Sequence, residues 1–164
     1  MDDKELVEKE RIAEREFKQW LDSNDLPYWY IHQEKDTFSP ALRHYISKRP
    51  DFVILIPVIG FIITDVEYKE PAKKYEEFQI DAEETTKYTN LQKHFNLHIG
   101  YVFSNAPQHF SVWYWIPVSR VLSKGRCFSS KEKTEFYAVP ITEFIQVSKT
   151  EGVERLFSQM AKFR

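Results

Sequence analysis

Three charged residues in one short segment, Asp65, Glu67 and Lys69, have the types and spacing needed for chemistry. They follow an apolar run that begins at Phe52 and is typical of buried β-strand, with a break at Pro57–Gly60. Because side chains alternate along a strand, all three charges should point to one face. Such charges beside a buried run are costly unless they are paired or bound to an ion.

Asp51, which precedes the apolar run, strengthens this interpretation. Gly60 suits a tight turn, so the two halves of the run predict a β-hairpin whose open ends bring Asp51 near Glu67. Two carboxylates and a lysine form a hard-oxygen site for Mg²⁺ or Mn²⁺, in which Lys69 assists a water or neutralises phosphate charge. In the alternative interpretation, the strand simply leaves the core here and the charges form weak, solvated ion pairs.

The segments Pro50-Asp51 and Glu67-Tyr68-Lys69 resemble the PD-(D/E)XK signature of restriction endonucleases, Holliday-junction resolvases and repair nucleases. This resemblance implies metal-dependent hydrolysis of phosphodiester bonds in DNA, with Mg²⁺ or Mn²⁺ as the cofactor. It also implies that Asp51, Glu67 and the backbone carbonyl of Tyr68 bind the metal, while Lys69 assists the attacking water.

Further residues are candidates around the same site. The run from Glu14 to Leu21 resembles the first helix of archaeal-type Holliday-junction resolvases, in which a glutamate seven residues before a core leucine reaches the metal. By that match Glu14 is the candidate and Glu16 the reserve, although a helical glutamate is ordinarily a surface residue. Supporting residues are expected at Asp65 and Gln79, and phosphate contacts at Arg49, Lys73 and Lys74.

The elements that must position these residues are predicted from periodicity and capping. We expect a helix over 2–23, a strand near Tyr28–His32, and a helix over 81–95, with Asp81 as N-cap and Glu84 at N3 in a capping-box arrangement. A buried strand over 98–103 then makes a parallel pair with the hairpin, because the second helix supplies the crossover. This order matches the restriction-endonuclease-like αβββαβ core, an α/β fold with a mixed central sheet flanked by helices, over Arg11–Phe103.

The rest of the chain is expected to extend this core. A polar loop over 70–78, a short helix over 40–46, a strand over 112–116 and a short helix after Pro117 are predicted. Phe136–Pro140 is expected as an edge strand, Thr142 as the cap of a helical turn over 143–147, and 151–163 as a helix. Residues 1–164 are thus expected to form one nuclease-like domain, with a core over about 11–116 and an extension over 117–164.

Composition sets outer bounds on the function. A hydrophobic content of 42% in 164 residues favours a folded chain. The net charge of −2 does not indicate nucleic-acid binding by itself, and the single Cys127 excludes an internal disulfide framework. The longest apolar run is too short to span a bilayer, and the charged N-terminus does not read as a signal peptide, so a cytoplasmic protein without a membrane partner is expected.

Two rival hypotheses accompany the nuclease. In one, the nuclease fold serves as a catalytically inactive module for binding nucleic acid or protein. In the other, an unrelated α/β domain carries the motif by chance. Under the nuclease hypothesis DNA is the partner, and a homodimer is the assembly that the resemblance allows, because many members of that superfamily dimerise to cut two strands.

Overall fold

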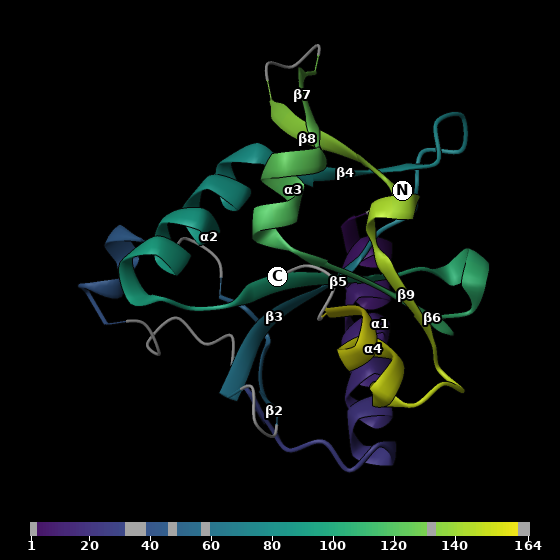
Figure 1. Ribbon diagram of the computed structural model, residues 1–164. Helices are drawn as coiled ribbons and strands as arrows, with labels where there is room; N and C mark the ends of the chain where they lie inside the picture. The colour runs from purple at the N-terminus through teal and green to yellow at the C-terminus, as the bar shows by residue number, and fades with distance from the viewer. Residues whose placement is uncertain (1–2, 32–38, 46–48, 57–59, 131–133, 161–164) are drawn as a thin grey trace.

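A mixed six-stranded sheet forms the centre of the computed structural model, which describes residues 3–31, 39–45, 49–56, 60–130 and 134–160 (Figure 1). The strand order is β1-β2-β3-β5-β6-β9, with β3 and β5 parallel and all other neighbours antiparallel. Six elements of the chain confirm the expected αβββαβ core: α1 (Asp3–Ser23), β1 (Tyr28–Tyr30), β2 (Phe52–Ile56), β3 (Gly60–Tyr68), α2 (Ala82–Phe95) and β5 (Ile99–Ser104). The short strand β4 (Glu77–Asp81) lies between β3 and α2 in the sequence.

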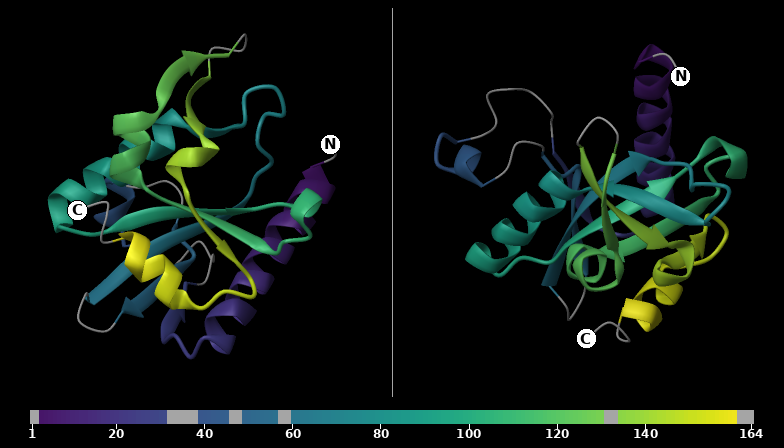
Figure 2. Two further views of the ribbon diagram at one scale, coloured as in Figure 1. Left: turned by 45° about the vertical axis from the view of Figure 1, so that its right-hand side comes forward. Right: turned by 90° about the horizontal axis from the view of Figure 1, so that it is seen from above.

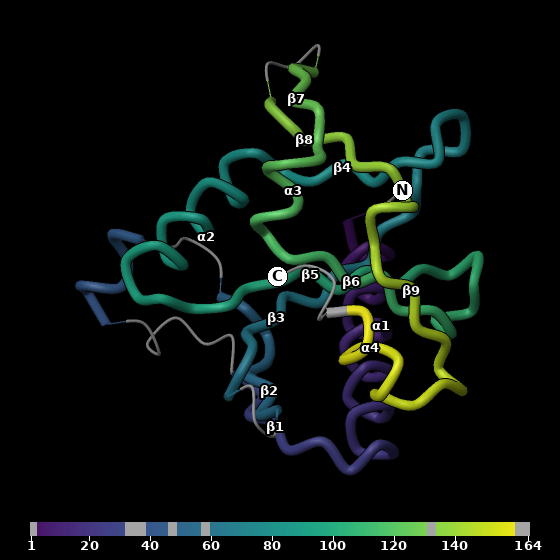
Figure 3. The backbone as a smooth tube through the Cα atoms, viewed as in Figure 1, coloured from purple at the N-terminus to yellow at the C-terminus, as the bar shows by residue number. Residues whose placement is uncertain are grey.

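A second, three-stranded sheet has the order β4-β8-β7. Its strand β4 directly precedes α2, and β7 and β8 come from the C-terminal part of the chain. Figure 3 traces this connection, in which β4 leads directly into α2. The remaining elements are η2 (Leu42–His44), η3 (Ala106–Gln108), β6 (Val112–Pro117), α3 (Val118–Lys124), β7 (Arg126–Ser129), β8 (Glu135–Pro140), η4 (Ile141–Glu143), β9 (Ile145–Ser148) and α4 (Val153–Met160).

Several local expectations are corrected by these pairings. Phe136–Pro140 is not an edge strand, because β8 lies between β4 and β7; Pro140 is its last residue, where a missing N–H is tolerated. The helical turn expected over 143–147 is wrong, since 145–148 forms β9, which pairs with β6. The polar loop expected up to Phe78 ends earlier, at the start of β4. The hairpin break at 57–59 and parts of the expected 28–32 strand and 40–46 helix lie outside the described residues.

The two faces of the central sheet pack against different helices. α1 forms because its buried residues Ala13, Phe17, Trp20 and Leu21 recur at helical spacing and make one apolar stripe. Phe17 packs edge-on against Phe52, with ring centroids 5.3 Å apart. α2 and α3 cover the other face with a second buried cluster, so α1 and α2 lie on opposite sides of the sheet (Figure 2). Among the described residues, no helix combines the length and apolarity needed to cross a membrane.

Candidate metal centre

The end of β3 separates apolar from charged side chains, as the alternation of a strand predicts. Ile62 and Val66 belong to the core beneath α1. Asp65 and Glu67 lie on the opposite face, opposite Tyr101 and Phe103 of the parallel strand β5. Both carboxylates are removed from solvent, since Asp65 is 0% and Glu67 8% exposed. The sequence-based expectation that these charges share one face is confirmed.

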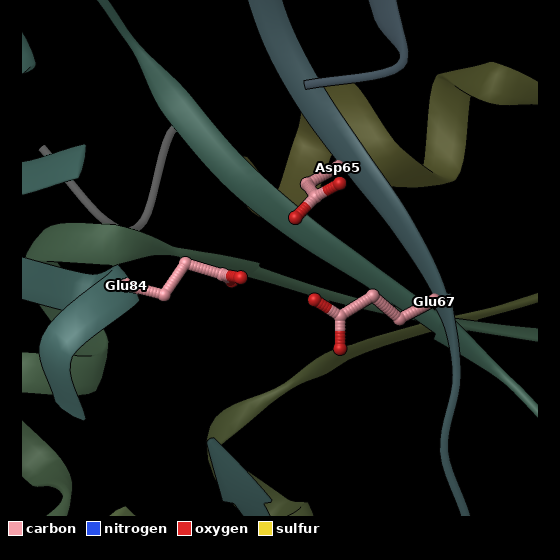
Figure 4. A group of neighbouring side chains, drawn as sticks. All are labelled: Asp65, Glu67 and Glu84. Carbon is pink, nitrogen blue, oxygen red and sulfur yellow. The ribbon is translucent and has the colours of Figure 1, made fainter. Parts of the chain in front are cut away.

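A third carboxylate, that of Glu84, joins them from α2. One oxygen from each of Asp65, Glu67 and Glu84 lies within 4.8 Å of the others. Figure 4 shows the three side chains converging from β3 and the first turn of α2. We refer to these three residues as the acidic group. Carboxylate oxygens at this spacing are the ligands that hard divalent cations prefer.

The cap of α2 explains how Glu84 reaches this position. Asp81 accepts a hydrogen bond from the Glu84 backbone N–H through Oδ1 at 2.8 Å, which confirms the predicted N-cap. In a full capping box the glutamate side chain would turn back to the N-cap amide, but here it is directed towards Asp65 and Glu67. Tyr88 and Leu91 follow at helical spacing and are buried, so Glu84 lies on the helix face that packs on the sheet.

Lys69 provides the positive charge beside the acidic group. Its Nζ forms an ion pair with Glu67 Oε2, and it lies 5.1 Å from the centroid of the Phe103 ring. The Lys69 side chain is 26% exposed, whereas that of Glu67 is 11% exposed. The ammonium therefore stands at the solvent edge of the acidic group, next to its least deeply buried β3 carboxylate.

Two buried tyrosines lie beneath the acidic group. Tyr88 Oη donates a 3.1 Å hydrogen bond to Asp65 Oδ2, and Tyr101 Oη lies 3.3 Å from Thr85 Oγ1. Burial, reinforced by the negative charges of Asp65 and Glu84, raises the pKa of Tyr88. Burial followed by the charge of Glu84 raises the pKa of Tyr101. Both phenols are therefore neutral near neutral pH, and Tyr88 serves Asp65 as a hydrogen-bond donor.

Asp51 lies at the open end of the β2–β3 hairpin, directly before β2, as expected. Phe52 pairs with Thr64, and the backbone N–H of Asp51 donates a 2.9 Å hydrogen bond to the carbonyl of the same Thr64. Its Oδ2 accepts a 2.7 Å hydrogen bond from the backbone N–H of Val66. Asp51 is buried but is not a member of the acidic group. Its role as a metal ligand stays a prediction.

Glu14 is placed on the α1 side of the sheet. It accepts a 2.6 Å hydrogen bond from Tyr30 Oη. The Tyr30 ring packs against Phe52, which belongs to the buried cluster between α1 and the sheet. Burial, then Glu14 and the charge of Asp51, raise the pKa of Tyr30. Glu14 thus approaches the Asp51 end of β2, while the acidic group lies on the other face. The reserve candidate Glu16 forms an ion pair with Lys149.

The remaining candidates lie on several elements and differ in exposure, and their roles at the site stay predictions. Gln79 is exposed on β4, on the face opposite the buried Phe78 and Ile80. Arg49 is buried just before Asp51 in the chain. Lys73 and Lys74 are exposed on the turn between β3 and β4.

Tyr68 faces away from the acidic group. Its side chain is on the α1 side of β3, where its hydroxyl donates to Glu70 and Lys9 lies over its ring. The proposed contribution of its backbone carbonyl to metal binding stays a prediction.

Sequence reasoning overlooked Glu84 as a site residue, although a signal was present. A crossover helix between parallel strands begins near the carboxyl end of the first strand, so the first turn of α2 had to lie near Glu67. Glu84 precedes Tyr88 and Leu91, which mark the core-facing side of the helix, at helical spacing. An acidic residue on the core-facing side of the first turn of α2 is therefore expected to lie close to Glu67.

No protein-family model and no curated protein matches this sequence. Solved structures do resemble it. One is Hjc, a Holliday junction resolvase from Archaeoglobus fulgidus, with a TM-score of 0.51 and 10% identity over 84% of this chain and 89% of that chain. Another is D212, a nuclease from a fusselovirus, with a TM-score of 0.46 and 12% identity over 90% of this chain and 87% of that chain. The likeness to Hjc confirms the expected resolvase-type fold.

Proposed function

We propose that this protein is a metal-dependent nuclease that hydrolyses phosphodiester bonds in DNA. The convergence of Asp65, Glu67 and Glu84 beside Lys69 is the observation that carries the proposal. The fold supports it, because a Holliday junction resolvase shares the same architecture. Since fold alone does not determine function, the acidic group carries more weight than the likeness.

The donor set fits a hard divalent cation. Three carboxylates so close together repel one another, and a bound cation relieves that repulsion. All three donors are oxygens, which suits Mg²⁺ or Mn²⁺ and not the softer metals that prefer sulfur. Asp65, Glu67 and Glu84 would hold the ion, which supplies a polarised phosphate oxygen and a water of lowered pKa when bound.

The protein's own groups have separate tasks in this proposal. Lys69 presents an ammonium at the solvent edge, where it can neutralise the charge that develops on the phosphate. Tyr88 holds Asp65 in one orientation through its hydrogen bond. The exposed Lys73 and Lys74 are the candidates for contacts to the DNA backbone, whereas Arg49 is buried.

The direct test is a cleavage assay with Mg²⁺ or Mn²⁺ on duplex, single-stranded and four-way-junction DNA. We expect wild-type protein to cut at least one substrate, and Glu67→Gln and Lys69→Ala to lose roughly a hundredfold or more of the rate. Glu83→Gln is the matched control, because Glu83 neighbours Glu84 on α2 but is exposed and pairs with Lys87 at 2.5 Å. Its activity should equal that of the wild type.

The opposite result would favour the inactive binding module. In that case the protein would bind DNA equally well with and without metal, and would cut none of the substrates. Measuring binding by fluorescence anisotropy in the same samples separates this outcome from a failure to bind DNA at all.

A further inference from the structure

Two buried tyrosines tie α2 to the strands beside the acidic group. Tyr88 on α2 donates its hydroxyl to Asp65 on β3 at 3.1 Å. Tyr101 makes a second link, from the sheet to the helix, because its Oη on β5 lies 3.3 Å from Oγ1 of Thr85 on α2. The two tyrosine rings pack together, with centroids 5.7 Å apart. All of these side chains are buried, so water does not compete for either link.

The hydroxyl of Thr85 determines the direction of the second link. Its Oγ1 donates to the backbone carbonyl of Asp81, the N-cap of α2, at 2.7 Å. A hydroxyl carries one proton and two acceptor lone pairs, so Thr85 accepts from Tyr101 and the phenol is the donor. The chain of hydrogen bonds therefore runs from β5 through Tyr101 and Thr85 to the first turn of α2.

Glu84 lies within the turn that these hydrogen bonds hold. It directly precedes Thr85, and its backbone N–H donates to the side chain of Asp81 at 2.8 Å. Tyr101 is the neighbour of Asp65 in the parallel pairing of β3 and β5. The link between Tyr101 and Thr85 therefore sets the distance from the turn of Glu84 to the strand that carries the other two carboxylates.

The acidic group needs such a restraint when no cation lies within it. Its three carboxylates carry like charges, whose repulsion acts to separate α2 from β3. Ligands that are already held at the spacing that an ion requires lose less freedom when the ion binds, and their affinity for it is higher. A hydrogen bond that keeps the first turn of α2 on the sheet should therefore strengthen metal binding without contributing a ligand.

We propose that Tyr101 is a positioning residue of the metal centre, which holds Glu84 within the acidic group by donating a hydrogen bond to Thr85. The proposal rests on the proposed metal-dependent function. It follows that removal of either hydroxyl weakens the binding of a divalent cation although all three carboxylates are retained. It also follows that the effect of Tyr101 depends on the presence of Glu84.

Mn²⁺ affinity, measured by calorimetry well below the melting temperature of each variant, tests this role. We expect Tyr101→Phe to bind about tenfold more weakly than the wild type, as for groups that orient metal ligands. Tyr114→Phe is the matched control, because Tyr114 is buried in the same cluster and has no hydrogen bond to α2 in the described part of the chain. The affinity of this control should equal that of the wild type.

Substitutions of Thr85 separate its hydroxyl from its shape. Thr85→Ser keeps the hydroxyl and should bind within about threefold of the wild type, whereas Thr85→Val keeps the branched shape alone and should bind about tenfold more weakly. In a Glu84→Gln background, where one ligand is already lost, Tyr101→Phe should reduce the affinity by less than about twofold further.

Several results would overturn the proposal. Wild-type affinity in Tyr101→Phe would show that its hydroxyl has no effect on the site. Equal affinities of Thr85→Ser and Thr85→Val would show that the Thr85 hydroxyl is not what matters. An equal loss from Tyr101→Phe with and without Glu84→Gln would mean that Tyr101 acts on another ligand. An equal loss in Tyr114→Phe would mean that the effect is one of general core packing.

A second measurement keeps the proposal testable if wild-type protein binds no Mn²⁺, a result that would count against the proposed function alone. In metal-free protein, NMR should show the carboxyl carbon of Glu84 and the amide protons in the first turn of α2 shifted in Tyr101→Phe but unchanged in Tyr114→Phe. A Glu84 carboxyl signal that stays in place in Tyr101→Phe would refute the positioning role.

Discussion

Glu67 at the end of β3 and Glu84 on the first turn of α2 bring carboxylate oxygens within 4.8 Å of each other. The two residues come from different elements, and the crossover from β3 through α2 to the parallel strand β5 is what brings them together. Asp65 completes the group and is fully buried. The chain thus concentrates buried carboxylates at one end of its central sheet. Burying charged groups costs free energy unless they are paired or bind an ion.

That cost predicts the behaviour of Glu84→Gln in the absence of metal. Removing one of three neighbouring negative charges relieves repulsion, so the melting temperature in a chelating buffer should rise by about 2–4 °C. Differential scanning calorimetry measures it. Glu83→Gln should show no such rise, because Glu83 is exposed and already paired with Lys87. A lower melting temperature for Glu84→Gln would show that its charge stabilises the metal-free fold.

Tyr88→Phe should destabilise the protein by about 1–3 kcal/mol, because Asp65 is buried and loses a hydrogen-bond donor. Urea unfolding monitored by circular dichroism gives the free energy of unfolding. Tyr75→Phe is the matched control, since Tyr75 is 62% exposed. Equal stability of Tyr88→Phe and wild type would mean that the hydroxyl contributes nothing to holding Asp65.

High pH should unfold the protein through its buried phenols. Burial raises the pKa of Tyr88 and Tyr101 in the folded state, above the value of about 10 for an unfolded chain. The unfolded chain therefore loses these protons first, so this contribution to stability is complete below about pH 10 and falls as the pH rises further.

Ultraviolet absorbance of phenolate, recorded alongside circular dichroism, tests this linkage. We expect the signals of Tyr88 and Tyr101 to appear only together with unfolding, and Tyr88→Phe to weaken the dependence of stability on pH above 10. Tyr28 provides a comparison, because burial and then its hydrogen bond to Asp22 raise its pKa to about 12. Ionisation of all tyrosines while the fold is intact would contradict the prediction.

The aromatic contact between α1 and the sheet should dominate the stability of the core. Phe17 is fully buried and its ring lies 5.3 Å from those of Phe52 and Trp113. Phe17→Ala should therefore cost about 3–5 kcal/mol in guanidinium unfolding. Phe95→Ala, at a position that is 50% exposed, should cost less than about 1 kcal/mol. Similar losses for the two variants would argue against this packing of α1.

The core was predictable from the sequence because its signals are local. The stripe containing Phe17 and Trp20 defines α1, Asp81 caps α2, and the run after Phe52 defines the hairpin strands. The shared face of Asp65, Glu67 and Lys69 also follows from strand alternation alone.

What escaped prediction depends on contacts between distant parts of the chain. β8 is a central strand because Ile80 and Tyr137 pair across a long separation, which no local pattern around Pro140 reveals. The 145–148 segment becomes β9 because Trp113 and Val147 pair, which overrides the helix-capping tendency of Thr142. Glu84 was interpreted as half of a capping box because that local signal is satisfied whether or not its side chain turns to the sheet.

Calorimetric titration of Mn²⁺ into wild-type protein and the Asp65→Asn, Glu67→Gln, Glu84→Gln and Glu83→Gln variants tests the central claim most directly. The account predicts saturable binding to wild type and Glu83→Gln, and at least about tenfold weaker binding to each variant of the acidic group, because each loses a ligand. The absence of saturable binding to the wild type, both alone and with a short DNA duplex present, would contradict it. So would equal affinity for all five proteins.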